Sequence, residues 1–221
     1  MHLETGSNLN VLPFAQEARK NVETYLLNEL GFLRKGKTGK FFRVEKEIHL
    51  FVFLEKPTIF THTSSGITPM YIPNATNIIF GHRLQGVFPG YVDLSETDDE
   101  QKSKLWAEKT IHILNNYMIP FYKQLVEPSA LLDYIENRTF KDSRWVSIWS
   151  EMELKAYTLA YLGERRRAIE ELKVFKSQKL IENERIIDRI INALESIPEG
   201  EDNNFFAAVI AENKKRLGLK I

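Results

Sequence analysis

The spacing of apolar residues changes near residue 95, and this change limits the folds that the chain can adopt. Before it, short runs rich in aromatic and β-branched residues lie between Pro, Gly and Asn residues, at 41–44, 48–54, 58–63, 67–72 and 77–84. After it, apolar residues recur at three- and four-residue steps as far as residue 217. Runs of the first kind are typical of strands, and steps of the second kind are typical of helices. The sequence therefore predicts an α+β protein whose strands all lie in its first part.

The first part also begins with a predicted helix, over residues 13–30. Its apolar residues share one helical face, and Gly31 supplies a stop signal. The gaps between the predicted strands are too short for parallel crossovers, which need a dozen or more residues. We therefore expect an N-terminal helix and an antiparallel sheet over residues 1–95. A helical half over residues 96–221 should pack on this sheet, so that the chain forms one compact unit.

The predicted helical half starts at a capping box, in which the Thr97 side chain accepts from the backbone and Glu100 reaches back. Pro120 is expected to kink the first long helix or to start another. Further helices are predicted over 164–177, 181–196 and 204–217. Residues 157–172 look like the helix–turn–helix core of a tetratricopeptide-type repeat, but one copy cannot form a solenoid. We therefore interpret this segment as a single packed helical hairpin.

Composition excludes several classes of protein. The chain has 30 basic and 30 acidic residues and no cysteine. Thiol nucleophiles, thiolate metal sites and disulfides are therefore ruled out. Neither half has the positive excess of a dedicated nucleic-acid binder, so nucleic acid is not the expected partner. Residues 57–82 carry no formal charge, but three prolines and a polar run interrupt them, and a cytoplasmic protein without membrane spans is expected.

Residues 31–38 match the phosphate-loop pattern G-x-x-x-x-G-K-S/T letter for letter. That pattern binds phosphates only when a strand precedes it and a helix follows it, because the helix N-terminus completes the site. Here a predicted helix precedes the pattern and a predicted strand follows it. Nucleotide binding through Lys37 and Thr38 is therefore not expected.

The same stretch is a cluster of cations without an acidic residue among them, next to Phe41 and Phe42. It consists of Arg34, Lys35, Lys37, Lys40 and Arg43. Such a cluster could contact an acidic surface, with the aromatic rings beside it. It could also decorate an edge strand, where lysines prevent aggregation. Phosphate-type contacts carry no base information, so a role in reading a nucleic-acid sequence is not favoured.

The histidines show no spacing typical of a metal site, and no G-x-S-x-G motif accompanies the serines at 64 and 65. His62 and His82 could meet across adjacent strands, with Ser64 or Ser65 as a conceivable nucleophile. Single histidines on strands are more often partly buried polar residues. We expect no cofactor and no metal, and an enzyme is not the favoured interpretation.

The charge-poor segment 57–91 supplies the leading hypothesis, a non-enzymatic protein that binds another protein. Its aromatic, Met and Arg residues are of the types that anchor interfaces, with Tyr71, Arg83 and Tyr91 as candidate binding residues. Burial in the core is the alternative explanation of the same residues. The competing functions are an enzyme acting on a phosphorylated or nucleotide substrate, and a nucleic-acid accessory factor that uses the basic turn 34–43.

Several short motifs resemble a bacterial protein family of unknown function. They are Leu30-Gly31-Phe32, Arg34-Lys35-Gly36, Phe42-Arg43, Tyr117-Met118-Ile119-Pro120-Phe121 and Leu131-Leu132. The resemblance implies a small stand-alone α+β protein without an assigned activity or catalytic residues. Some small bacterial proteins of this kind are immunity factors against secreted toxins, so an immunity-like role is included among the expected binding functions.

Overall fold

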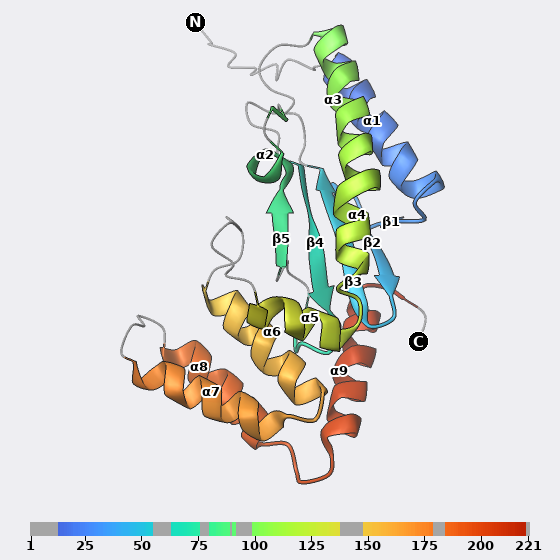
Figure 1. Ribbon diagram of the computed structural model, residues 1–221. Coiled ribbons are helices and arrows are strands. Elements are labelled where there is room, and N and C mark those ends of the chain that lie inside the picture. Colours follow the sequence, from blue (N-terminus) through green and yellow to red (C-terminus); the bar gives the residue numbers. More distant parts are fainter. Residues whose placement is uncertain are drawn as a thin grey trace, which may run out of the picture.

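The computed structural model describes residues 13–54, 63–75, 80–88, 90–91, 99–137, 148–178 and 184–219. It shows an α+β fold: an N-terminal helix, an antiparallel sheet of five strands, and then helices (Figure 1). The fold class predicted from the change of spacing is therefore confirmed. Parts of the strands predicted over 58–63 and 77–84 lie outside the described residues, as does Thr97.

The strands are β1 (Leu33–Arg34), β2 (Lys40–Glu45), β3 (Ile48–Leu54), β4 (Thr63–Pro69) and β5 (Phe80–Arg83), and they lie side by side in chain order. All four pairings are antiparallel. The prediction of separate strands over 58–63 and 67–72 is wrong for the described part, because one strand runs from Thr63 to Pro69. Its bounds follow the pairing with β3, in which Leu54 faces Thr63 and Ile48 faces Pro69.

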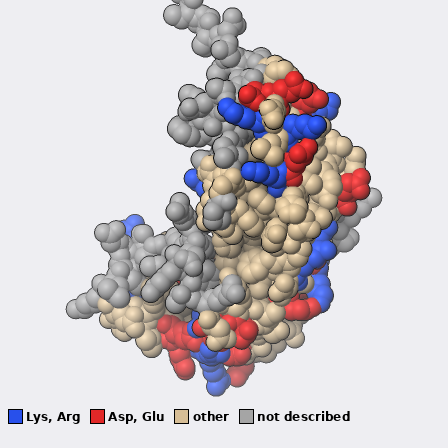
Figure 2. Space-filling view, turned by 45° about the horizontal axis from the view of Figure 1, so that its top comes forward, with Lys and Arg blue, Asp and Glu red and all other residues tan. Residues whose placement is uncertain are grey.

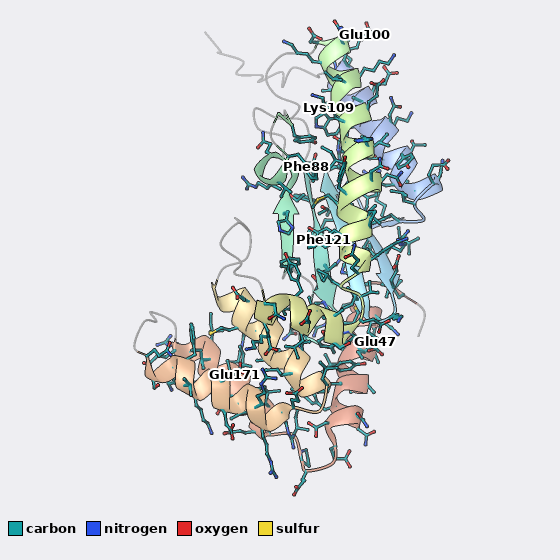
Figure 3. The ribbon with its side chains drawn as sticks, in the orientation of Figure 1. Glu47, Phe88, Glu100, Lys109, Phe121 and Glu171 are labelled. Atoms are coloured by element: carbon teal, nitrogen blue, oxygen red, sulfur yellow. The ribbon has the colours of Figure 1, made fainter. Side chains whose placement is uncertain are left out.

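One face of the sheet is covered by helices. These are α1 (Pro13–Asn28), α3 (Glu100–Ile113), the π-helical turn η1 (Leu114–Met118) and α4 (Ile119–Lys123) (Figure 1). The buried side chains of that face include Phe41, Leu50, Val52, Ile67 and Phe80. Figure 3 labels Phe121 of α4, whose ring lies 6.5 Å from that of Phe80. The core of the first part therefore lies between this face and the helices.

The structure corrects the predicted start of α3 and shows what Pro120 does in the segment after it. The helix begins at Glu100 with Asp99 as its N-cap, because the Asp99 carboxylate accepts from the backbone N–H of Lys102 at 2.8 Å. The capping box starting at Thr97 is therefore wrong by two residues. Pro120 lies in the first turn of α4, and the wider turn η1 comes directly before it. Pro120 thus starts a new helical segment that continues the preceding one.

The remaining helices gather mainly at one end of the sheet (Figure 1). They are α5 (Pro128–Asn137), α6 (Ile148–Tyr161), α7 (Arg165–Ser177), α8 (Glu184–Glu195) and α9 (Asp202–Arg216), while the short α2 (Leu84–Val87) follows β5. The helical hairpin predicted over 157–172 is confirmed by α6 and α7, which turn at Gly163 with a φ of +87°. No helix in the described ranges is both long and apolar enough to cross a bilayer.

Buried polar contacts connect this helical end to the sheet. The Tyr161 hydroxyl donates to Glu47, which lies where the sheet meets the helices (Figure 3). The Tyr71 ring, just after β4, stacks on the Tyr161 ring at 4.3 Å, and its hydroxyl lies 3.1 Å from that of Thr158. The helices are therefore held to the sheet by specific hydrogen bonds as well as by apolar packing.

Candidate functional site

The basic stretch predicted as a binding site forms a tight turn between β1 and β2. The Lys35 N–H donates to the Lys40 carbonyl at 2.9 Å, and the Thr38 hydroxyl donates to the Lys35 carbonyl at 2.5 Å. Gly36 has a φ of +57°, in the left-handed region that glycine adopts without steric cost. Because a strand follows this loop, no helix N-terminus faces it, and the phosphate-loop geometry is absent from this described segment.

Gly39 fixes this turn against the rest of the sheet. A Cβ at this position would lie 1.8 Å from the Leu54 carbonyl oxygen, so only glycine permits the close approach. The Leu54 N–H donates to the Gly39 carbonyl at 2.8 Å, and Arg19 of α1 donates to the Leu54 carbonyl at 3.3 Å. The turn is therefore anchored to β3 and, through it, to α1.

Two of the five predicted cations are neutralised within the molecule. Arg34 pairs with Glu23 of α1 at 3.2 Å, and its guanidinium lies over the Phe41 ring. Arg43 pairs with Glu45 and donates to the Leu30 carbonyl at 2.5 Å. These contacts connect the sheet to α1 and to the residues after it. Both arginines therefore have structural roles.

The other three cations form what we call the lysine turn: Lys35, Lys37 and Lys40. None of them has an acidic partner among the residues that the structure describes. Lys37 is exposed, and the Lys40 ammonium lies over the Phe53 ring at 6.0 Å from its centroid. The lysine turn is thus a group of positive charges on a hydrogen-bonded turn, without acidic partners in the described chain.

His49 lies on β3 opposite Val44, on the side of the sheet away from α3 and α4. It is 9% exposed, and its ring packs edge-on against that of Phe42 at 5.2 Å. Burial, together with the nearby Lys35 and Lys40 charges, lowers the pKa of His49 from 6.5 to about 4. His49 is therefore neutral at pH 7.

The other predicted binding residues are not gathered at this site. Tyr71 is buried, and Tyr91 is buried with its hydroxyl bonded to Thr63 and Thr110 at 3.0 and 2.8 Å. Both side chains therefore belong to the core, as the alternative explanation of the charge-poor segment holds. Arg83 is exposed at the end of β5.

The serine and histidine side chains do not form a hydrolytic site in the described part of the chain. Ser65 and His82 are cross-strand partners, whereas Ser64 faces the other side of the sheet. His82 Nδ1 lies 2.8 Å from the Tyr122 hydroxyl, which donates to the Ser65 carbonyl. Burial lowers the pKa of His82, and the Ser65 hydroxyl has no partner in the structure. His62 lies outside the described residues.

A metal centre and a cavity are two further kinds of site that the structure could hold. The described residues contain no group of three side chains able to hold a metal ion. They do line an open cavity of about 340 Å³ between residues 72–75, α6 and α8, which sequence analysis missed. Its polar residues are Asn74 in the turn after β4 and Glu153, Tyr157 and Arg189 on two helices, and they form no linear motif. Only the spacing of Glu153 and Tyr157, four residues apart on one helix, could have indicated a shared face.

Comparison with known proteins gives no relative: no family model, no curated protein and no solved structure matches the chain. The function is therefore argued from the geometry and charge of the molecule itself. On the face drawn in Figure 2, basic and acidic side chains lie intermixed, without an extended area of one sign. A local cluster such as the lysine turn is thus a more specific feature than the overall charge.

Proposed function

We propose that the chain is a non-enzymatic binding protein that contacts an acidic segment of a partner protein through the lysine turn. One observation carries the proposal: Lys35, Lys37 and Lys40 lack acidic partners in the described chain, while Arg34 and Arg43 beside them are paired. Charges of one sign that are unpaired within a molecule are available to steer and orient a partner of opposite charge.

The surroundings of the lysine turn favour a protein partner over nucleic acid. Phe41 and Phe42 are buried, so neither ring is free to stack on a base. Leu33, just before the turn, is 52% exposed and offers an apolar contact beside the lysines. A segment that combines carboxylates with an apolar side chain fits this surface. An immunity-like role, in which the partner is a toxin, is one form of this proposal.

The rigidity of the turn reduces the entropic cost of binding. Its backbone is held by hydrogen bonds and by the close contact at Gly39. An exposed lysine–carboxylate pair contributes about 0.2 to 1 kcal/mol. Removing three such pairs should cost about 0.6 to 3 kcal/mol, which corresponds to a loss of affinity of about 3- to 150-fold.

The test uses a labelled peptide of alternating Glu and Leu, with binding followed by fluorescence anisotropy at low salt. The turn variant carries Lys35→Gln, Lys37→Gln and Lys40→Gln. The control variant carries the same change of charge at three exposed lysines of α3 and α4: Lys104→Gln, Lys109→Gln and Lys123→Gln. We expect the turn variant to lose about 3- to 150-fold in affinity and the control variant less than about twofold.

Three results would contradict the proposal. Equal losses in both variants would mean that binding follows net charge and not the lysine turn. A single-stranded oligonucleotide of equal charge that binds more tightly than the peptide, and loses affinity in the turn variant, would assign the surface to nucleic acid. Absence of peptide binding by the wild-type protein, even at low salt, would also refute the proposal.

A further inference from the structure

The cavity of about 340 Å³ lies in the helical part of the molecule and shares no residue with the lysine turn. Its walls include apolar groups from Ile72, Pro73 and Ala193. Its polar groups come from Asn74 in the turn after β4, from Glu153 and Tyr157 on α6, and from Arg189 on α8. A cavity of this size is typical of sites for small ligands, and its polar and apolar groups fit a ligand that is itself part polar and part apolar.

The wall formed by residues 72–75 is held in place by α9. The Asn213 amide donates to the carbonyls of Met70 and Ile72 at 2.6 and 2.8 Å, and it is buried. Arg216 donates to the Asn74 side chain at 2.6 Å. The cavity is therefore formed before any ligand binds, which lowers the entropic cost of binding.

The polar groups of the cavity place opposite charges side by side. Arg189 Nη2 lies 3.2 Å from Glu153 Oε1, and the two side chains are 65% and 23% exposed. The Arg189 guanidinium thus reaches the mouth of the cavity, while the Glu153 carboxylate lies further inside. A ligand that approaches this pair meets a cation and an anion at adjacent positions.

Tyr157 completes the arrangement. It is 3% exposed, and its hydroxyl forms no hydrogen bond within the described part of the chain. Burial and the nearby Glu153 raise the pKa of Tyr157 to about 12, so the hydroxyl keeps its proton at neutral pH. Because Tyr157 lines the cavity, its protonated hydroxyl is a hydrogen-bond donor that a bound ligand can use.

We propose that this cavity binds a free α-amino acid with an apolar side chain. The ammonium group of such a ligand pairs with Glu153, and its carboxylate pairs with Arg189. The Tyr157 hydroxyl donates to the same carboxylate. The ligand side chain packs against Ile72, Pro73 and Ala193. Adjacent ammonium and carboxylate groups are characteristic of a free amino acid, and they complement the adjacent carboxylate and guanidinium of the cavity.

The first set of measurements compares different ligands on the wild-type protein, so it does not depend on whether a variant folds. Binding of L-leucine is measured by isothermal titration calorimetry and by ligand-observed NMR. Leucinamide lacks the carboxylate, and 4-methylpentanoate lacks the ammonium group. Because a charge-assisted contact is lost in each case, we expect both to bind about 10- to 100-fold more weakly than L-leucine.

The second set of measurements compares variants of the protein. Glu153→Gln and Arg189→Gln are each expected to weaken L-leucine binding about 10- to 100-fold. Ala193→Leu should block the cavity. A matched control changes an exposed ion pair between α7 and α8, Lys173 with Glu195 at 2.7 Å, through Glu195→Gln. This control should leave binding unchanged.

The proposal is overturned if L-leucine does not bind at millimolar concentration, or if leucinamide and 4-methylpentanoate bind as tightly as L-leucine. It is also overturned if Glu195→Gln weakens binding as much as Glu153→Gln. Thermal unfolding of each variant shows whether a loss of binding is accompanied by loss of the fold.

Discussion

His49 should make the stability of the protein depend on pH between 7 and 4. Its pKa is lowered to about 4 in the folded protein, mainly by burial and then by the charges of Lys35 and Lys40. In the unfolded chain the same imidazole has its ordinary pKa of about 6.5. Between these two values the unfolded chain therefore binds a proton that the folded protein does not bind. The contribution of neutral His49 to stability is present above pH 6.5 and is lost as the pH falls towards 4.

The size of the effect follows from the difference between the two pKa values. A difference of about 2.5 units at about 1.4 kcal/mol per unit gives about 3 kcal/mol between pH 7 and pH values below 4. At pH 5 the loss amounts to about 2 kcal/mol. This is a large share of the stability of a typical domain, which is about 5 to 15 kcal/mol.

The measurement compares urea unfolding of the wild-type protein and His49→Gln at pH 7, 6, 5 and 4.5. His82 has a pKa lowered by burial in both proteins, so its contribution cancels in the comparison. We expect the wild-type protein to lose about 2 kcal/mol more than the variant between pH 7 and 5. An NMR titration of the His49 ring gives its pKa directly, and Lys35→Gln with Lys40→Gln should raise it. Equal pH dependence in the two proteins, or a His49 pKa near 6.5, would refute the reasoning.

Three further perturbations test other parts of the structure. Asn213→Ala removes the amide that donates to the carbonyls of Met70 and Ile72, and it should lower the free energy of unfolding by about 2 to 5 kcal/mol. Urea unfolding measures this loss, and an unchanged midpoint would contradict the hydrogen bonds described. Gly66→Ala places a Cβ 2.3 Å from the Phe80 carbonyl oxygen, so it should destabilise the protein by about 3 kcal/mol. The variant should therefore have a lower melting temperature, and a melting temperature equal to that of the wild-type protein would argue against this close contact. Lys37→Ala should leave any ATP or GTP affinity unchanged in equilibrium dialysis, and micromolar binding lost in this variant would restore the nucleotide hypothesis.

The helices after residue 100 could largely be predicted from the sequence, because the helical period and the glycine stops are local signals. Gly163 and Gly218 follow the ends of α6 and α9 and have φ values of +87° and +72°, the left-handed conformation in which glycine ends helices. The extent of β4 could not be predicted in this way. Its first residues are small and polar, and they belong to a strand because β3 pairs with them from Thr63 onwards.

The candidate site was visible in the sequence only as a cluster of cations. Which of them remain unpaired depends on Glu23 and Glu45, and Glu23 reaches Arg34 only because α1 packs beside the sheet. The cavity at Glu153 was not visible at all, because its walls come from a turn and two helices that are distant in sequence. Burial of Tyr71 likewise depends on packing against α6, which no local pattern reveals.

The contact between Asn213 and the turn after β4 also determines when this turn can complete its hydrogen bonds during synthesis of the chain. The amide and the carbonyls of Met70 and Ile72 that it bonds are 143 and 141 residues apart. A ribosome adding about 5 to 20 residues per second needs on the order of ten seconds to cover that distance. During this interval the sheet end has emerged while its carbonyls still lack the donor that later satisfies them. The nascent chain therefore passes through a stage at which the turn after β4 lacks the donor that α9 later supplies.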